Sequence, residues 1–145
     1  MAGVSSSIVV NVSPENFFKV ITDYENYPKF LNDLQEAKIT KRKGNEVEGR
    51  FKLKLIKTVD YTLKMIEDAP KILKWTLVES SLMKSNDGSW KLEPLEGGKK
   101  TKAEYSIDIG FGLFVPKMIT NQLTKVNLPA TLKAFKEEAE KRFKG

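Results

Sequence analysis

The chain has 145 residues and a formal net charge of +6; 40 % of its residues are apolar and 30 % are charged. This composition is typical of a soluble globular protein, and the length favours one domain covering residues 1–145. The sequence contains no cysteine and no histidine. It therefore excludes disulfides, thiolate nucleophiles, histidine-dependent triads and histidine zinc sites, and we expect neither a metal nor a cofactor.

The N-terminal sequence argues against export. Residues 1–12 lack the basic region and the long apolar run of a signal peptide. No stretch of the chain is apolar over the length that a membrane-spanning helix requires. We therefore expect a cytoplasmic protein without a transmembrane segment, whose basic charge allows transient contact with a membrane surface.

The first 31 residues predict one strand and two short helices. Residues 5–12 are rich in β-branched side chains, which favours a strand. The Ser-Pro-Glu motif at 13–15 combines a capping serine, a first-turn proline and a first-turn acid. A helix should therefore begin there and end near Asp23. Residues 24–31 predict a turn and a second short helix anchored by aromatic side chains.

Strands then follow one another as far as residue 109. Apolar and polar residues alternate with a period of two, most clearly over 47–55 and 59–65, so each strand has one apolar and one polar face. Segments rich in Gly, Asn, Asp or Pro separate the strands and predict turns at 43–45, 68–71, 86–88 and 96–99. The expected strands cover residues 37–42, 47–55, 59–65, 72–82, 89–95 and 103–109.

The last thirty residues predict the one long helix of the chain. Apolar residues over 115–145 recur at steps of three and four, which places them on one helical face. Two such sets are offset from one another near Pro129, where we expect a kink, because proline removes one backbone hydrogen bond. Only this helix is long enough to cover the apolar face of a curved antiparallel sheet.

The order of elements and several motifs resemble the START-like superfamily, also called the polyketide cyclase/dehydrase and lipid transport or SRPBCC superfamily. The most specific matches are Tyr-Pro-Lys-Phe-Leu at 27–31 and Gly-Ser-Trp-Lys-Leu-Glu-Pro-Leu at 88–95, with weaker matches at 13–15, 69–70 and 77–79. The similarity is greatest to the coenzyme Q-binding branch, which includes ribosome association toxins. After Glu79 this branch often has Gly-Pro-Phe, where this chain has Ser-Ser-Leu.

The resemblance implies an α+β helix-grip fold. In that fold a curved antiparallel β-sheet wraps around a long C-terminal α-helix, and two short helices follow the first strand. It also implies a hydrophobic ligand cavity, holding a quinone or a lipid in the nearest relatives, and no shared catalytic residues. The expected function is therefore binding or transport of a hydrophobic small molecule, such as a lipid, an isoprenoid quinone or a polyketide-like compound. We expect no turnover.

The cavity expected between sheet and helix should be lined by apolar and aromatic side chains, although the same alternation also describes an ordinary packed core. Residues 110–116 form either a gate over this cavity or a plain turn. Tyr61, Tyr105 and Glu79 are the candidate polar groups that orient a ligand. Glu79 is the one acid in a largely apolar strand, although an outward, solvent-exposed glutamate is the favoured reading. The candidate lining residues are Phe51, Leu53, Tyr61, Leu63, Met65, Trp75, Leu77, Trp90, Tyr105, Ile107, Phe111, Phe114, Met118, Ile119 and Leu123.

Two other functions remain open at this point. Basic residues gather in one hairpin region, which suits a ribosome or an acidic protein partner, although an ordinary solvated surface is the favoured explanation. DNA is not an expected partner. The second alternative is a polyketide cyclase/dehydrase-type enzyme with an acid or base inside the cavity. The basic hairpin residues are Lys38, Lys41, Arg42, Lys43, Arg50, Lys52 and Lys54.

Overall fold

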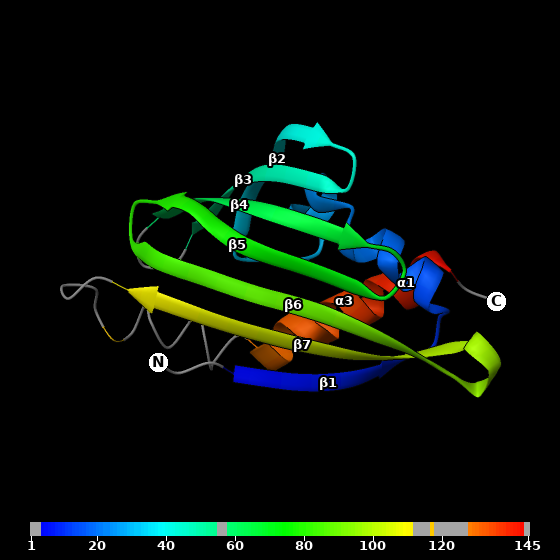
Figure 1. Ribbon diagram of the computed structural model, residues 1–145. Helices are drawn as coiled ribbons and strands as arrows, with labels where there is room; N and C mark the ends of the chain where they lie inside the picture. Colours follow the sequence, from blue (N-terminus) through cyan, green and yellow to red (C-terminus); the bar gives the residue numbers. More distant parts are fainter. Residues whose placement is uncertain (1–3, 55–57, 112–116, 118–127, 144–145) are drawn as a thin grey trace.

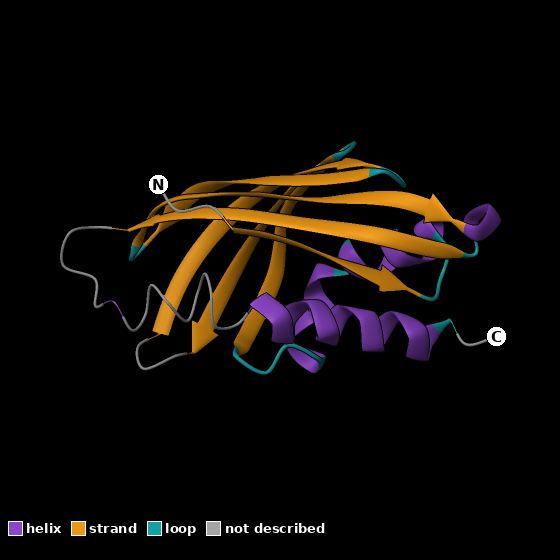
Figure 2. Ribbon diagram, turned by 90° about the horizontal axis from the view of Figure 1, so that it is seen from below, coloured by secondary structure: helices purple, strands orange, loops and turns teal. Residues whose placement is uncertain are grey.

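The computed structural model describes residues 4–54, 58–111, 117 and 128–143. One antiparallel sheet of seven strands forms a curved layer, and the helices lie on one side of it (Figures 1 and 2). The elements in chain order are β1 Val4–Val10, α1 Pro14–Ile21, η1 Tyr24–Lys29, β2 Leu34–Lys43, β3 Glu46–Lys54, β4 Thr58–Asp68, β5 Ile72–Ser80, β6 Met83–Leu95, η2 Glu96–Gly98, β7 Lys100–Phe111 and α3 Leu128–Arg142.

The sheet is a meander closed at one edge by the first strand. Its order is β1-β7-β6-β5-β4-β3-β2, and every neighbouring pair is antiparallel. Alternation places one set of side chains on the inner face; on β3, for example, Val47, Gly49 and Phe51 are buried. The predicted helix-grip fold, with its curved sheet, short helices after the first strand and C-terminal helix, is confirmed.

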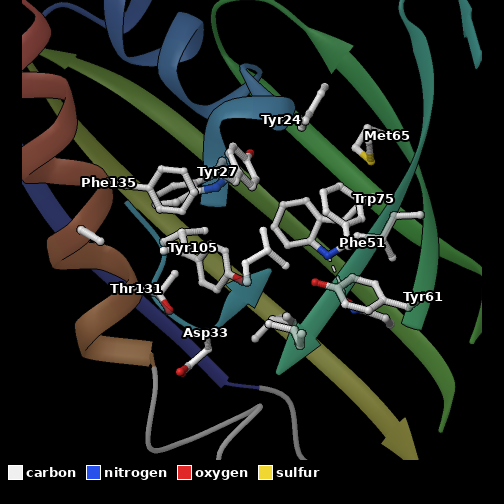
Figure 3. Close-up of a pocket in the computed structure, with 18 of the residues that line it drawn as sticks. Tyr24, Tyr27, Asp33, Phe51, Tyr61, Met65, Trp75, Tyr105, Thr131 and Phe135 are labelled. Carbon is white, nitrogen blue, oxygen red and sulfur yellow. Dashed lines mark hydrogen bonds between the residues drawn. The ribbon is translucent and has the colours of Figure 1, made fainter. Parts of the chain in front are cut away.

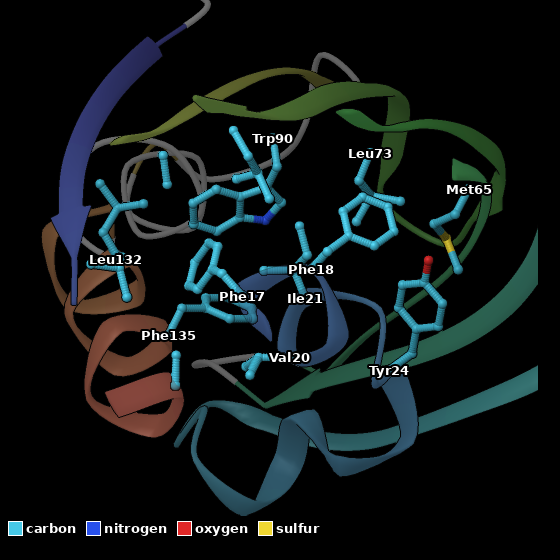
Figure 4. Close-up of a cluster of buried hydrophobic side chains, with 14 of the residues drawn as sticks. Phe17, Phe18, Val20, Ile21, Tyr24, Met65, Leu73, Trp90, Leu132 and Phe135 are labelled. Atoms are coloured by element: carbon cyan, nitrogen blue, oxygen red, sulfur yellow. The ribbon is translucent and has the colours of Figure 1, made fainter. Parts of the chain in front are cut away.

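The N-terminal helix begins as its sequence predicts. Ser13 caps α1, because its hydroxyl accepts a hydrogen bond from the Asn16 backbone N–H at 3.3 Å. The apolar side of α1 then enters the core, where Phe17 meets Trp90 edge to face with ring centroids 5.4 Å apart (Figure 4). Trp90 in turn contacts Phe135 of α3 at 5.3 Å. Strand, N-terminal helix and C-terminal helix therefore share one core.

Polar contacts hold α3 against the first strand and against the short helices. Lys136 donates a hydrogen bond to the Val9 carbonyl at 3.1 Å, and Glu140 accepts one from the Asn11 N–H at 2.9 Å. At the last residue of α3, Arg142 pairs with Asp23 at 2.8 Å. These contacts lie in the C-terminal half of α3 and hold that half against β1 and the start of η1, with the helix over the inner face of the sheet (Figure 2).

Two predicted boundaries need comment. The expected turn at 86–88 is wrong, because these residues belong to β6 and the chain turns at Ser81 and Leu82. There the Ser80 hydroxyl accepts hydrogen bonds from the N–H groups of Leu82 and Met83, at 3.2 and 3.1 Å, and so tightens the turn. The helix predicted from residue 115 is described over Leu128–Arg142. The kink near Pro129 remains a prediction, because residues 118–127 lie outside the described part of the chain.

Candidate functional site

A cavity of about 340 Å³ lies between the inner face of the sheet, η1 with its connection to β2, and α3 (Figure 3). This volume is near the lower end of the range of roughly 300–1,000 Å³ that small-molecule sites occupy. The exposed lining residues are Asn32, Asp33 and Ala130, so the cavity reaches the surface between the η1–β2 connection and α3. The sheet and its helical cover thus leave a space that side chains do not fill.

Aromatic rings form most of the cavity wall. Phe51 and Tyr61, opposite one another on β3 and β4, are stacked with centroids 5.4 Å apart. Tyr105 on β7 lies 5.6 Å from Trp75 and 4.9 Å from Trp90. All four tyrosines and both tryptophans of the chain line this cavity. Such a wall is apolar over its faces and offers polar groups only at a few ring edges.

A glycine allows one of these rings to lie directly on the sheet. Gly88 on β6 is opposite Trp75 on β5. A Cβ at Gly88 would lie 2.2 Å from Trp75 Cζ2, so only glycine leaves room for the indole in this position. The indole N–H also donates a hydrogen bond to the Asn86 side-chain oxygen at 3.2 Å. Asn86 is buried, and this hydrogen bond explains why an Asn-Asp-Gly sequence runs on as a strand instead of turning.

The four tyrosine hydroxyls differ in how they are bonded. Tyr24 donates to Glu67 at 2.7 Å, and Tyr27 donates to the Ile21 carbonyl. Within the part of the chain that the structure describes, the hydroxyls of Tyr61 and Tyr105 have no hydrogen-bond partner. Burial raises the pKa of both groups above its ordinary value, and the neighbouring Tyr105 raises the pKa of Tyr61 further. Both side chains are therefore neutral donors at physiological pH.

Charge is sparse around the cavity. Asp33, at the opening, is the one charged residue among the described lining residues. No lysine or arginine lines the space over residues 4–54, 58–111, 117 and 128–143. The same part of the chain contains no group of three or more acids placed to hold a metal ion. The described wall can therefore exclude water, stack on flat molecules and donate a few hydrogen bonds.

The structure brings most of the sequence-predicted residues together. The residues that line the cavity are Phe51, Leu53, Tyr61, Leu63, Met65, Trp75, Trp90, Tyr105 and Ile107. Leu77 and Phe111 do not line it; they pack instead against a neighbouring apolar cluster around Val59 and Met83. Phe114, Met118, Ile119 and Leu123 lie outside the described residues. Their contribution to a binding site remains a prediction.

Glu79 does not occupy the position expected of a group that orients a ligand. It is exposed on β5 and lies outside the cavity lining. A register shift between Thr62 and Leu63 of the neighbouring β4 strand accompanies this placement, so the simple alternation of β5 does not extend to its end. The structure therefore contradicts an inward Glu79.

Sequence reasoning missed the contribution of η1, its connection to β2 and the start of α3. The aromatic residues of η1 had been assigned only to anchoring, although their dense spacing was a usable signal. Asn86 was missed because its neighbours indicate a turn. The cavity residues absent from the prediction are Tyr24, Tyr27, Phe30, Leu31, Asn32, Asp33, Leu34, Leu73, Met83, Asn86, Ile109, Ala130, Thr131, Ala134 and Phe135.

The predicted basic hairpin does not form an uninterrupted positive surface. Arg42 pairs with Glu67 at 3.2 Å, and Lys52 lies 3.8 Å from Glu36. Glu48 lies directly opposite Lys41 in the β2–β3 ladder. Acidic side chains are thus interleaved with the lysines and arginines, which weakens the field that an anionic partner would meet. No helix in the described part of the chain has the length and apolarity to cross a membrane.

Comparison with known structures supports the same architecture. A START superfamily protein from Mycobacterium smegmatis is 18 % identical, with 97 % of this chain and 99 % of that chain covered and a TM-score of 0.83. The Zhui aromatase/cyclase from a Streptomyces species is 16 % identical over 97 % and 94 % of the two chains, with a TM-score of 0.85. A STAR-related lipid transfer protein fragment from Xanthomonas axonopodis is 16 % identical over 95 % and 85 %, with a TM-score of 0.79.

These structural similarities, at TM-scores of 0.79 to 0.85, establish the fold, and a match to a family model establishes the relationship. The family described as polyketide cyclase / dehydrase and lipid transport matches residues 1–140. That match covers nearly all of the sequence, including α1, η1, all seven strands and most of α3. The chain therefore belongs to the polyketide cyclase/dehydrase and lipid transport family.

Proposed function

We propose that this protein binds a hydrophobic small molecule in the cavity between its sheet and α3. The observation that supports this proposal most is a 340 Å³ space whose wall includes every tyrosine and tryptophan of the chain. Membership of a family that includes lipid transport agrees with it. A ligand that buries roughly 200 Å² of apolar surface here would gain on the order of 5 kcal/mol from leaving water.

The site favours binding over catalysis. A histidine-free cavity would need another acid or base near the substrate, with a pKa close to the working pH. Burial instead raises the pKa of the tyrosines that line the inner part, which makes them weak acids and keeps them protonated. The described lining has one carboxylate, Asp33, and it lies at the opening. Sequestration and transport therefore fit the cavity better than a cyclase reaction.

The volume also limits the ligand. A molecule of two or three fused rings fits a space of this size, whereas a long isoprenoid or acyl chain would extend through the opening beside Asp33. A quinone ring, as in the coenzyme Q-binding branch, is one candidate for the enclosed part. Docking on a ribosome or an acidic protein remains a prediction, and the interleaved acids on β2 and β3 give it little support.

Fluorescence of a neutral apolar probe, N-phenyl-1-naphthylamine, tests the proposal. Trp75 and Trp90 both line the cavity, so a probe bound there should accept energy from tryptophan. An Ala134→Phe variant places a ring in the cavity and should abolish the transfer. Lys133→Phe is the matched control, because Lys133 is exposed on the same helix and outside the lining. Absence of probe binding, or equal binding by the Ala134→Phe variant, would overturn the proposed function.

A further inference from the structure

Two of the four tyrosine hydroxyls are bonded within the protein, and the other two remain available to a ligand. Tyr24 and Tyr27 use their hydroxyls within the protein, on Glu67 and on the Ile21 carbonyl. Tyr61 and Tyr105 have no partner for theirs in the described structure, although both side chains are half-buried against the cavity. Neither hydroxyl oxygen is sealed inside the protein: among the described residues, the buried side-chain oxygens without a partner are those of Asp60 and Asp108. Both tyrosine hydroxyls can therefore donate to a ligand or a water molecule in the cavity.

The two unpartnered hydroxyls face the same cavity from two strands. In Figure 3 the hydroxyl ends of Tyr61 and Tyr105 point toward one another across the cavity. The two groups also interact electrostatically, since Tyr105 contributes to the raised pKa of Tyr61. They come from β4 and β7, on opposite sides of the β5–β6 pair, and therefore converge from two directions.

Asn86 adds a third donor to this side of the cavity. The indole N–H of Trp75 can only donate, so the Asn86 atom 3.2 Å away must be its oxygen. The amide nitrogen is then directed elsewhere, and its one described contact is the Met83 sulfur at 3.6 Å, a weak acceptor. Because its acceptor is occupied by Trp75, Asn86 offers the cavity N–H groups only.

The described lining supplies no positive charge to balance an anion. Among the described residues, no lysine or arginine lines the cavity. An anion buried without a cation loses its hydration and gains no compensating charge, whereas a neutral carbonyl loses little hydration and can accept two hydrogen bonds. A cavity wall that has hydrogen-bond donors but no cation therefore favours a ligand with a neutral acceptor group.

Resting on the proposed function, we propose a chemical class of ligand: a neutral, flat molecule whose enclosed end is a hydrogen-bond acceptor such as a ketone carbonyl. Tyr61 and Tyr105 donate to that acceptor, and Asn86, held by Trp75, is a further donor in the cavity wall. Free fatty acids and other carboxylates are rejected. Selectivity thus depends on two tyrosine hydroxyls that the protein itself leaves unused.

Three ring compounds of nearly equal size separate these contributions, each competing with N-phenyl-1-naphthylamine. Fluorenone has a neutral carbonyl, fluorene lacks it, and fluorene carboxylate carries a charge. Fluorene is the more apolar of the first two, so hydrophobicity alone would favour it over fluorenone. We expect fluorenone to bind about tenfold tighter than fluorene, and the carboxylate to bind about a hundredfold weaker than fluorenone.

Tyrosine-to-phenylalanine variants identify the donors. Tyr61→Phe and Tyr105→Phe should each weaken fluorenone binding about fivefold, leave fluorene binding nearly unchanged, and together remove the preference for the ketone. Thr101→Val is the control, because the buried Thr101 hydroxyl donates to the Val12 carbonyl and lies outside the cavity lining. It should lower stability without changing the ratio of the two affinities. Circular dichroism of each variant establishes that it is folded before its affinities are compared.

The possible results separate the two proposals. A ketone preference that disappears in the double variant supports the inference. Equal binding of fluorene and fluorenone by the unmodified protein, or carboxylate binding as tight as that of fluorenone, overturns the inference while the hydrophobic site stands. Failure of the probe and of all three competitors to bind overturns the proposed function, and the inference with it.

Discussion

Replacing Gly88 by alanine should displace the Trp75 ring and destabilise the protein. A Cβ at this position would lie 2.2, 2.3 and 2.6 Å from Cζ2, Cε2 and Nε1 of Trp75. These atoms belong to a rigid ring, so the indole must move as a whole. Its movement breaks the 3.2 Å hydrogen bond to Asn86 and leaves a buried amide oxygen without a partner.

The expected cost follows from these contacts. An unsatisfied buried acceptor costs about 1–3 kcal/mol, and the lost packing of Trp75 on Tyr105 adds about 0.5–1.5 kcal/mol. Alanine is preferred over glycine in a strand by roughly 0.5–1 kcal/mol, which offsets part of this. We therefore expect Gly88→Ala to lower the free energy of unfolding by about 2 kcal/mol.

Urea denaturation followed by far-UV circular dichroism measures this change, since tryptophan fluorescence would respond to the displaced ring itself. Gly49→Ala on β3 is the control, because its Cβ would lie no closer than 3.2 Å to Met65 Cε and 3.3 Å to the Phe51 ring, so that shifts of a few tenths of an ångström accommodate it. It should cost less than about 1 kcal/mol. In a Trp75→Leu background the clash is absent, and Gly88→Ala should then cost almost nothing. Equal costs in the two backgrounds, or a cost no larger than that of Gly49→Ala, would refute the reasoning.

Three further predictions concern stability. Thr101→Val should cost about 1–2 kcal/mol in urea denaturation, because the fully buried Thr101 hydroxyl donates to the Val12 carbonyl at 2.8 Å; an unchanged midpoint would contradict this. Ser13→Ala should cost about 1 kcal/mol, whereas Ser13→Asp should preserve the cap to Asn16. Burial raises the pKa of all four tyrosines above the ordinary value of 10.0. The contribution of the neutral tyrosines to the free energy of unfolding is therefore complete below pH 10 and decreases as the pH rises above it. Above pH 10 each tyrosine should lower the free energy of unfolding by about 1.4 kcal/mol per pH unit. Tyrosinate absorbance should therefore appear together with unfolding, and titration of the tyrosines in the folded protein near pH 10 would contradict this.

Local patterns determined where the elements lie and which face of each strand turns inward. The alternation over β3 and β4 identified Phe51, Tyr61 and Met65 as inner-face residues, because a period of two places them on one side of any strand. The cap at Ser13 was readable for a similar reason, since it acts on a backbone group three residues away. Signals of this kind depend only on neighbours in the sequence.

Contacts between distant residues decided the rest. The sequence Asn86-Asp87-Gly88 indicates a turn until Trp75, eleven residues before Asn86, is placed against it. The hydroxyls of Tyr24 and Tyr61 look alike in the sequence, and only the packing of η1 beside Glu67 gives one of them a partner.

The sequence by itself therefore determined a curved sheet with an apolar inner face and a C-terminal helix long enough to cover it. Only the tertiary structure decided that a 340 Å³ space remains between them, and which polar groups face into it. The physical reason is that periodicity encodes the direction of a side chain relative to its own backbone. The distance between two packed elements depends instead on all the side chains between them.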